Sequence, residues 1–347
     1  MARVFIDGFE SGGTELWTTE ETMTAAAINT STVNSGKYSV FISDANECLT
    51  NLHSFSSIFA DTIYFKFYYN CSYWGLYRGA VCSILSTIPD THASLTIDDT
   101  GLFKFTHGNA ENTVIGIADT KIKKGEWNLI EGKIVVHSSA GSVILRLNEQ
   151  EVINETNVRT QSLSTATTIP GFCLGRQYGT SGQYKQAGYY DDIVLDTSTF
   201  PGPGKIYALT PNEKGNSEQW SPVGANLNYE RINLIPHQWG SRITTNAVDQ
   251  LDLYELADIF VYDKIITQVK SAQVQAVAAA DGSPTPTSIN LSLRTNATNY
   301  HGSDQTVVGM PPDNSCFFET WTLNPDTSAA WTETEINGME IGVRSRA

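Results

Sequence analysis

Short runs of β-branched and aromatic residues, separated by Gly, Asn, Asp and Ser, recur along the whole chain. This pattern constrains the possible folds more than any other feature of the sequence. Residues 63–69 are rich in aromatics, while residues 102–106, 143–147 and 273–277 alternate between apolar and polar side chains. Alternation with period two is typical of a strand that buries one face. Long helical periodicity is nearly absent. The sequence therefore predicts an all-β protein made of two antiparallel β-sandwich or jelly-roll domains.

One short helix is expected near the C-terminus. Thr332 and Glu335 have the spacing of a capping box, in which each side chain bonds the other residue's backbone N–H. Trp331 stands where a hydrophobic staple residue would pack back on the helix. Such a helix is only about two turns long, so it needs tertiary support.

The domain boundary is expected at the Pro-Gly-Pro-Gly sequence that follows Phe200. The 347 residues exceed one typical domain of about 100–200 residues, and two prolines and two glycines cannot continue a strand. We predict a jelly-roll domain over residues 1–199, a linker over residues 200–204 and a β-rich module over residues 205–347.

Charge and motif content exclude several classes of function. The net charge is -15 and no block of basic residues exists, which disfavours nucleic-acid binding. No apolar run is long enough for membrane insertion, and no secretory signal is visible. The five cysteines are widely spaced without a CxxC pair, which predicts buried free thiols rather than a zinc site. Phosphate-loop, dinucleotide and G-x-S-x-G motifs are missing, so no cofactor is expected.

The first 200 residues resemble a concanavalin A-like, laminin G-type jelly roll. The resemblance is carried by residues 5–12 (Phe-Ile-Asp-Gly-Phe-Glu-Ser-Gly), 35–40, 124–131 and 190–194 (Tyr-Asp-Asp-Ile-Val), in that order. It implies two large antiparallel sheets whose first and last strands lie side by side. It also implies that Trp127 anchors the core.

Catalytic residues are not expected in this domain. Glycosidases of this architecture need two carboxylates flanking the scissile bond, and their Glu-x-Asp-x-x-Glu motif is missing here. We therefore predict that the chain is not an enzyme. Asp191 and Asp192 are adjacent and point to opposite faces of a strand. They are the candidates for a calcium site, with structural hydrogen bonding as the alternative.

Aromatic residues near two expected loops are the candidates for contact with a glycan or a partner protein. Aromatic faces stack on sugars and dominate many interfaces, and the alternative is packing inside the sandwich or against a neighbouring subunit. The aromatic candidates are Tyr73, Trp74, Tyr77, Tyr178 and Tyr184, and Arg78 is a candidate beside them.

Residues 200–347 resemble a module of tailed-bacteriophage virion proteins. The resemblance implies a non-enzymatic virion structural protein on an appendage or outer surface, such as a tail, fibre or decoration, that contributes to attachment to host glycans. The expected partners are other virion proteins, further copies of the chain (a trimer is one candidate) and host surface polysaccharide. The expected location is the virion, assembled in the host cytoplasm. The alternative is a carbohydrate-binding module or glycoside hydrolase of the concanavalin A-like fold. The matching segments are residues 200–206, 209–212, 219–222, 228–233, 252–256 and 324–337.

Overall fold

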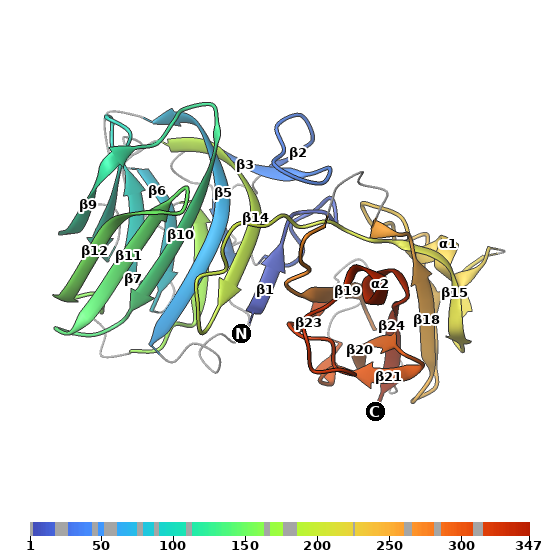
Figure 1. Ribbon diagram of the computed structural model, residues 1–347. Coiled ribbons are helices and arrows are strands. Elements are labelled where there is room, and N and C mark those ends of the chain that lie inside the picture. Colours follow the sequence, from blue (N-terminus) through green and yellow to red (C-terminus); the bar gives the residue numbers. More distant parts are fainter. Residues whose placement is uncertain are drawn as a thin grey trace. The chain divides into compact units, whose positions relative to one another are not determined.

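A computed structural model shows two compact units, Met1–Tyr207 and Ala208–Ala347, each built of antiparallel strands (Figure 1). This architecture confirms the predicted all-β fold class. None of the described helices has the length and apolarity needed to cross a membrane. The structure describes residues 3–17, 27–43, 48–51, 61–74, 79–86, 90–108, 113–162, 167–175, 186–224, 226–259, 266–280, 286–307 and 315–347.

The N-terminal unit contains two sheets, which we name sheet A and sheet B. Sheet A has eight strands, and β1 at the start of the chain pairs with β14 at the end of the unit, as the jelly-roll resemblance implies. The order in sheet A is β12 (Gln150–Val158), β11 (Gly141–Leu147), β10 (Trp127–Val135), β5 (Thr62–Trp74), β14 (Gln186–Asp196), β3 (Ser39–Ser43) and β2 (Ala27–Asn29), with β1 (Arg3–Asp7) beside β14.

Sheet B has six strands and shares the hydrophobic core with sheet A. Side chains from both sheets, including Phe65, Phe67, Phe103, Phe105 and Phe172, are fully buried. Strand β11 alternates strictly between buried and half-buried positions, as its sequence predicted. The order in sheet B is β4 (Cys48–Asn51), β13 (Gly171–Gly175), β6 (Gly79–Leu85), β7 (Thr91–Ile97), β8 (Leu102–His107) and β9 (Val114–Lys121).

The tryptophan that anchors the core is Trp17, and the expectation for Trp127 was wrong. Trp127 is only half-buried, because it lies at the first position of β10 near the end of the sheet. The Trp17 ring stacks on Phe9 at 6.2 Å and meets Phe5 edge-on at 5.3 Å. Its Nε1–H donates to Asp7 Oδ2 at 2.6 Å, so the buried indole is satisfied.

The Pro/Gly segment at the expected boundary packs against the outer face of sheet A. The Phe200 ring meets the Tyr64 ring at 5.3 Å and lies 3.9 Å from the Arg146 guanidinium. The backbone N–H of Gly202 donates to the buried carboxylate of Glu131 at 2.7 Å. These contacts explain why the first unit extends to Tyr207.

The C-terminal unit is built on a second six-stranded antiparallel sheet and two short strand pairs. The order in the large sheet is β15 (Pro211–Glu218), β18 (Leu251–Leu256), β24 (Glu340–Arg346), β20 (Ser288–Thr295) and β21 (Thr298–His301), with β22 (Gln305–Thr306) also beside β20. The two pairs are β16 (Ser221–Pro222) with β17 (Ile243–Thr244), and β19 (Ala272–Ala278) with β23 (Ser315–Trp321). Val274 and Phe317 of the second pair pack against Ile289 and Leu291 of the large sheet.

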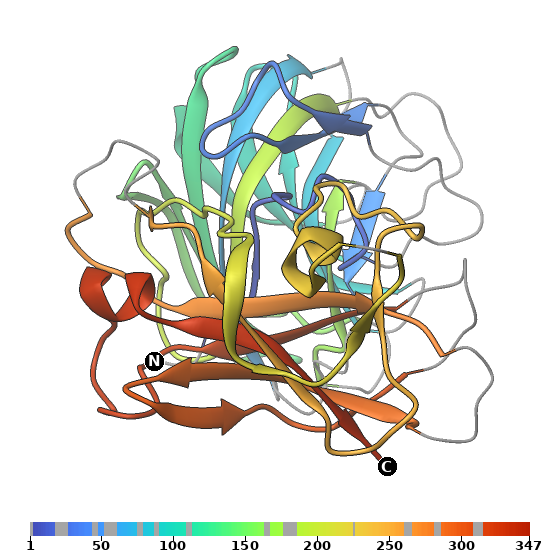
Figure 2. The same ribbon diagram turned by 90° about the vertical axis from the view of Figure 1, so that its right-hand side faces the viewer.

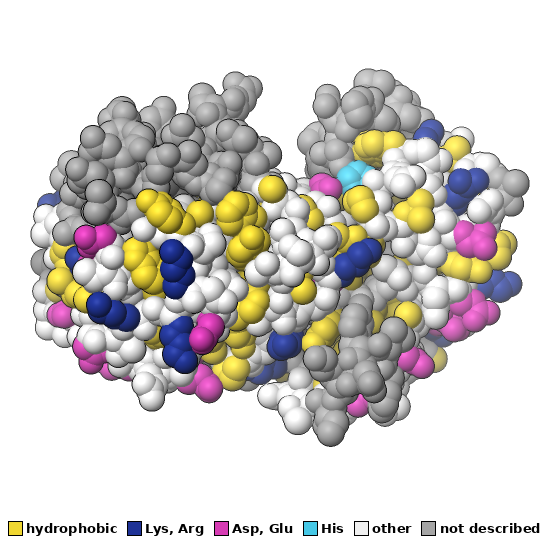
Figure 3. Space-filling view, turned by 90° about the horizontal axis from the view of Figure 1, so that it is seen from above, with side chains coloured by type: hydrophobic (Ala, Val, Ile, Leu, Met, Phe, Trp, Pro, Cys, Tyr) yellow, Lys and Arg dark blue, Asp and Glu magenta, His cyan; other side chains and the backbone are white. Residues whose placement is uncertain are grey.

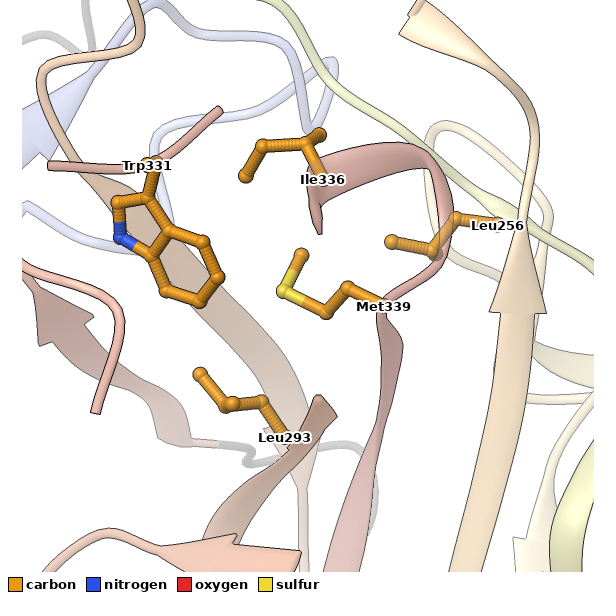
Figure 4. Close-up of a cluster of buried hydrophobic side chains, with 5 residues drawn as sticks. All are labelled: Leu256, Leu293, Trp331, Ile336 and Met339. Atoms are coloured by element: carbon orange, nitrogen blue, oxygen red, sulfur yellow. The ribbon is translucent and has the colours of Figure 1, made fainter. Parts of the chain in front are cut away.

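The predicted helix near the C-terminus is present as α2 (Glu333–Asn337). Thr332 Oγ1 accepts from the Glu335 backbone at 3.2 Å, and Glu335 Oε2 accepts from the Thr332 backbone at 2.7 Å, which confirms the capping box. The helix is held by a buried cluster around the Trp331 indole (Figure 4). The cluster consists of Leu256, Leu293, Trp331, Ile336 and Met339.

A second helix, α1 (Asn228–Ile232), was not predicted, and it lies well apart from α2 (Figure 2). Its first residue is fixed by the buried Asp252, whose Oδ2 accepts from Asn228 Nδ2 at 2.6 Å. Asp252 also accepts from the Trp220 backbone at 2.7 Å and from the Tyr254 hydroxyl at 2.6 Å. One buried carboxylate therefore organises the turn before α1 and the helix itself.

Candidate functional site

Two of the predicted contact residues, Tyr73 and Trp74, end strand β5 at the surface of the N-terminal unit. The Tyr73 side chain is 48% exposed and Trp74 is half-buried. The Trp74 indole is fixed from two sides. Its Nε1–H donates to the Asp99 carbonyl at 3.0 Å, and its ring lies so close to Gly101 that an added Cβ would be 3.2 Å from Cζ2. The pair therefore places an indole that is held in one position beside an exposed phenol ring.

The ammonium of Lys124 lies over both rings. Its Nζ is 5.7 Å from the centre of the Tyr73 ring and 5.4 Å from that of Trp74. Both distances are within the range of a cation–π contact. We call Tyr73, Trp74 and Lys124 together the aromatic–lysine surface.

Lys124 is positioned by a tight turn between β9 and β10. Gly125 adopts a left-handed φ of 76°, and its N–H donates to the Cys71 carbonyl at 2.9 Å. The N–H of the buried Ile122 donates to the Gly101 carbonyl at 3.0 Å. These bonds tie the turn to β5 and to the neighbouring turn, so the lysine backbone is held in place before any ligand arrives.

Asp98 organises the turn that carries Asp99 and Gly101. Its Oδ1 accepts from the backbone N–H of Thr100 at 2.9 Å and of Leu102 at 3.1 Å, and its Oδ2 pairs with Lys104 at 2.7 Å. Burial alone would raise the pKa of Asp98, but the bonds from Lys104, Thr100 and Leu102 outweigh it and lower the pKa to about 2. The carboxylate is therefore ionised at neutral pH.

A buried polar network supports β5 from inside the sandwich. The Tyr69 hydroxyl donates to Gln186 Oε1 at 2.5 Å, Gln186 Nε2 donates to Tyr190 Oη at 3.1 Å, and Tyr190 donates to the Val81 carbonyl of sheet B at 3.0 Å. Burial raises the pKa of both tyrosines, so both hydroxyls keep their protons. Gly188 makes room, since an added Cβ would lie 2.3 Å from the Tyr69 ring. Nothing in the local sequence indicated this network.

The other four predicted contact residues lie outside the described part of the chain: Tyr77, Arg78, Tyr178 and Tyr184. Their contribution to a contact surface stays a prediction.

The calcium candidates Asp191 and Asp192 are both buried and hydrogen-bonded to the turn at Asn34 and Ser35. Asp191 Oδ2 accepts from the Asn34 backbone at 2.8 Å, while Asp192 accepts from Asn34 Nδ2 and Ser35 Oγ, each at 2.6 Å. Burial, followed by the charge of Asp192, raises the pKa of Asp191. Within the described ranges, no three acidic, histidine or cysteine side chains are arranged to hold a metal ion. Calcium binding stays a prediction.

Asp7 and Glu10 lie in the same part of the unit, and we name the group of Asp7, Glu10, Asp191 and Asp192 the acidic corner. Glu10 Oε1 accepts from the Tyr38 backbone at 3.0 Å. Burial raises the pKa of Asp7 to about 7, although the bond from Trp17 opposes this rise. Burial also raises the pKa of Glu10, with a further contribution from Asp192.

The C-terminal unit holds one serine–histidine pair that the sequence did not reveal. Ser292 Oγ and His301 Nδ1 share a hydrogen bond of 2.8 Å across β20 and β21, where the two residues are direct cross-strand partners. Ser292 is 0% exposed, so its hydroxyl is not accessible to a substrate. The pair therefore stabilises the strand pairing rather than forming a nucleophile with its base.

The cysteines whose burial the structure describes are all buried, as expected: Cys71, Cys82, Cys173 and Cys316. Cys71 and Cys82 are free thiols. Basic and acidic side chains are interspersed on the face drawn in Figure 3.

No protein-family model matches the chain, and no curated protein matches its sequence. Solved structures do resemble it. Cip1, a cellulose-induced protein, is 13% identical with a TM-score of 0.44, covering 58% of this chain and 100% of its own. The alginate lyase vAL-1 from Chlorella virus is 11% identical with a TM-score of 0.37, covering 50% and 88%. A Trypanosoma rangeli sialidase is 9% identical with a TM-score of 0.36, covering 49% of this chain and 26% of its own.

These comparisons correct two predictions. The chain was expected to be a non-enzymatic virion structural protein, whereas the solved structures that resemble it include alginate lyases and a sialidase, which are enzymes.

Proposed function

We propose that the N-terminal unit binds polysaccharide at the aromatic–lysine surface. The observation that carries the proposal is the exposed Tyr73 ring beside a Trp74 indole that is already fixed by Asp99 and Gly101. Rigid aromatic faces bury large apolar area at low entropic cost, and sugar rings present C–H faces of matching size. Because the surface is formed in advance, little ordering is needed on binding.

The competing explanation is that the same rings pack against another protein subunit. An aromatic pair at an exposed strand end suits either partner, since interfaces are also enriched in Tyr and Trp. The two explanations differ in what Tyr73→Ala changes. A glycan surface loses affinity for polysaccharide, whereas a subunit interface loses assembly without any effect on polysaccharide.

Affinity electrophoresis of the full chain through gels that contain single polysaccharides tests the proposal. We expect retardation by at least one polymer and a loss of about tenfold in affinity for Tyr73→Ala. Ile117→Ala is the matched control, because Ile117 is also an exposed apolar side chain of this unit, at 53%. Equal retardation of Tyr73→Ala and the wild type would contradict the proposal. The same mixtures are assayed for new chain ends, which reports cleavage.

We also propose, on the resemblance of residues 200–347 alone, that the chain is carried on a bacteriophage particle as a homo-oligomer beside other virion proteins. The polysaccharide would then belong to the host surface. Light scattering of the purified chain tests the oligomer, and a monomer at all concentrations would contradict it. Mass spectrometry of purified particles tests the location.

A further inference from the structure

The turn that carries Lys124 is basic within a strongly acidic protein. Lys121, Lys123 and Lys124 are all exposed, whereas Ile122 between them is buried and anchors the turn. The chain as a whole has a net charge of -15. Three ammonium groups therefore lie on the turn beside the rings of the aromatic–lysine surface.

Four acids, Asp98, Asp99, Asp119 and Glu126, lie on this turn and on the segments beside it, and two of them pair with lysines. Asp98 pairs with Lys104, and Glu126 pairs with Lys123 at 3.4 Å through two exposed side chains. Exposed pairs of this kind are weak and exchange readily with another anion. In the described part of the chain, Lys124 makes no ion pair, and its ammonium faces the two rings.

We propose that the aromatic–lysine surface selects anionic polysaccharide, in which a carboxylate or sulfate group pairs with Lys124 while the sugar ring stacks on Tyr73. The inference rests on the proposed function and deepens it. The hydroxyls of a neutral sugar can accept hydrogen bonds from the ammonium, but these bonds are weaker than those to an anionic acceptor. An anionic substituent replaces them with a charge-assisted bond, and Lys121 and Lys123 add attraction along the polymer.

The test compares pairs of polymers that share a backbone and differ in charge. Polygalacturonate is paired with its fully methyl-esterified form, and dextran sulfate is paired with dextran, so that carboxylate and sulfate are examined separately. Affinity electrophoresis uses the full chain at low and high salt. The variants are Lys124→Ala and Lys133→Ala. Lys133 is the matched control, because its ammonium also lies over a tyrosine, 5.5 Å from the Tyr64 ring, elsewhere on the same unit.

We expect at least one anionic polymer to bind about tenfold more tightly than its neutral partner, and added salt to remove this difference. Lys124→Ala should weaken binding of the anionic polymer by about 2- to 5-fold and leave the neutral polymer unchanged. Lys133→Ala should match the wild type.

Two results would overturn the inference in distinguishable ways. Equal affinity for the charged and neutral members of both pairs, or an equal loss for both in Lys124→Ala, rejects anion selection while polysaccharide binding stands. Retention by none of these polymers nor by any other polysaccharide rejects the proposed function together with the inference.

Discussion

The two units bury their strands very differently. In the N-terminal unit, β6 and β7 are buried at every position, so both faces of these strands are covered. In the C-terminal unit, β15 is exposed or half-buried along its whole length. Tyr73 and Trp74 end β5 of sheet A, a strand that is not buried at every position, and Lys124 lies in the turn between β9 and β10.

The units also differ in how many side chains share the core. Sheets A and B enclose one extended core of aromatic and aliphatic residues, whereas the C-terminal unit relies on small clusters such as the one around Trp331. Loss of one large side chain should therefore matter more in the C-terminal unit.

Trp331→Ala tests this difference most directly and has the largest expected effect. Removing the indole leaves a cavity beside Leu293 and Met339. It also removes the N–H that donates to the Trp321 carbonyl at 3.0 Å, so this carbonyl loses its hydrogen bond. We expect a loss of about 3–5 kcal/mol in the C-terminal unit, with the N-terminal transition unchanged in calorimetry. Leu323→Ala, at a side chain that is 44% exposed, is the control. A single transition shifted as a whole would show that the units do not unfold separately.

The acidic corner should make the stability of the N-terminal unit fall as the pH rises from about 4 towards 7. The pKa of Asp7 is raised to about 7 in the folded state, from the ordinary value of 3.8. A raised carboxyl pKa stabilises the fold below pH 3.8, and this stability is lost as the pH rises towards 7. We expect the free energy of unfolding to fall by on the order of 3 kcal/mol across that window.

Asp7→Asn is the matched variant for that pH series, because the amide keeps an acceptor for Trp17 and cannot ionise. Urea unfolding at several pH values measures the slope. A slope that is the same in Asp7→Asn and the wild type would assign the pH dependence to other groups.

Gly188→Ala tests whether the buried polar network stiffens the N-terminal unit. The added methyl would lie 2.3 Å from the Tyr69 ring and must displace it from Gln186. We expect a destabilisation of about 1–3 kcal/mol. Gly240→Ala is the control, since nothing lies within 4 Å of its added Cβ. Thermal unfolding measures the melting temperature of both variants. Equal shifts in the two variants would show that the structure accommodates the methyl group at Gly188 without loss of stability.

Asp98→Ala has the smallest expected effect and links stability to binding. The change removes the carboxylate that accepts from Thr100 and Leu102, so the turn that holds the Trp74 indole loosens. We expect a loss of about 1 kcal/mol in stability and about 2-fold weaker polysaccharide binding. Tryptophan fluorescence anisotropy and affinity electrophoresis measure the two effects. Unchanged affinity would show that the indole does not need this turn.

Local patterns predicted what local physics controls. The alternation in residues 143–147 placed strand β11 and its buried face, because side chains of a strand point alternately to opposite sides. The spacing of Thr332 and Glu335 placed α2, because a capping box closes within one helical turn. The aromatic run at residues 63–69 predicted a strand, and Tyr73 and Trp74 at its end were named as contact residues.

Tertiary structure decided the features that join distant segments. Trp17 rather than Trp127 became the core tryptophan, because strand register placed Trp127 at a sheet end. The sequence alone predicted the all-β class, several of the strands and two residues of the candidate site. Only the packing of two turns against β5 brought Lys124 to Tyr73 and Trp74, since such long-range contacts depend on strand register and loop closure, which local sequence patterns do not encode.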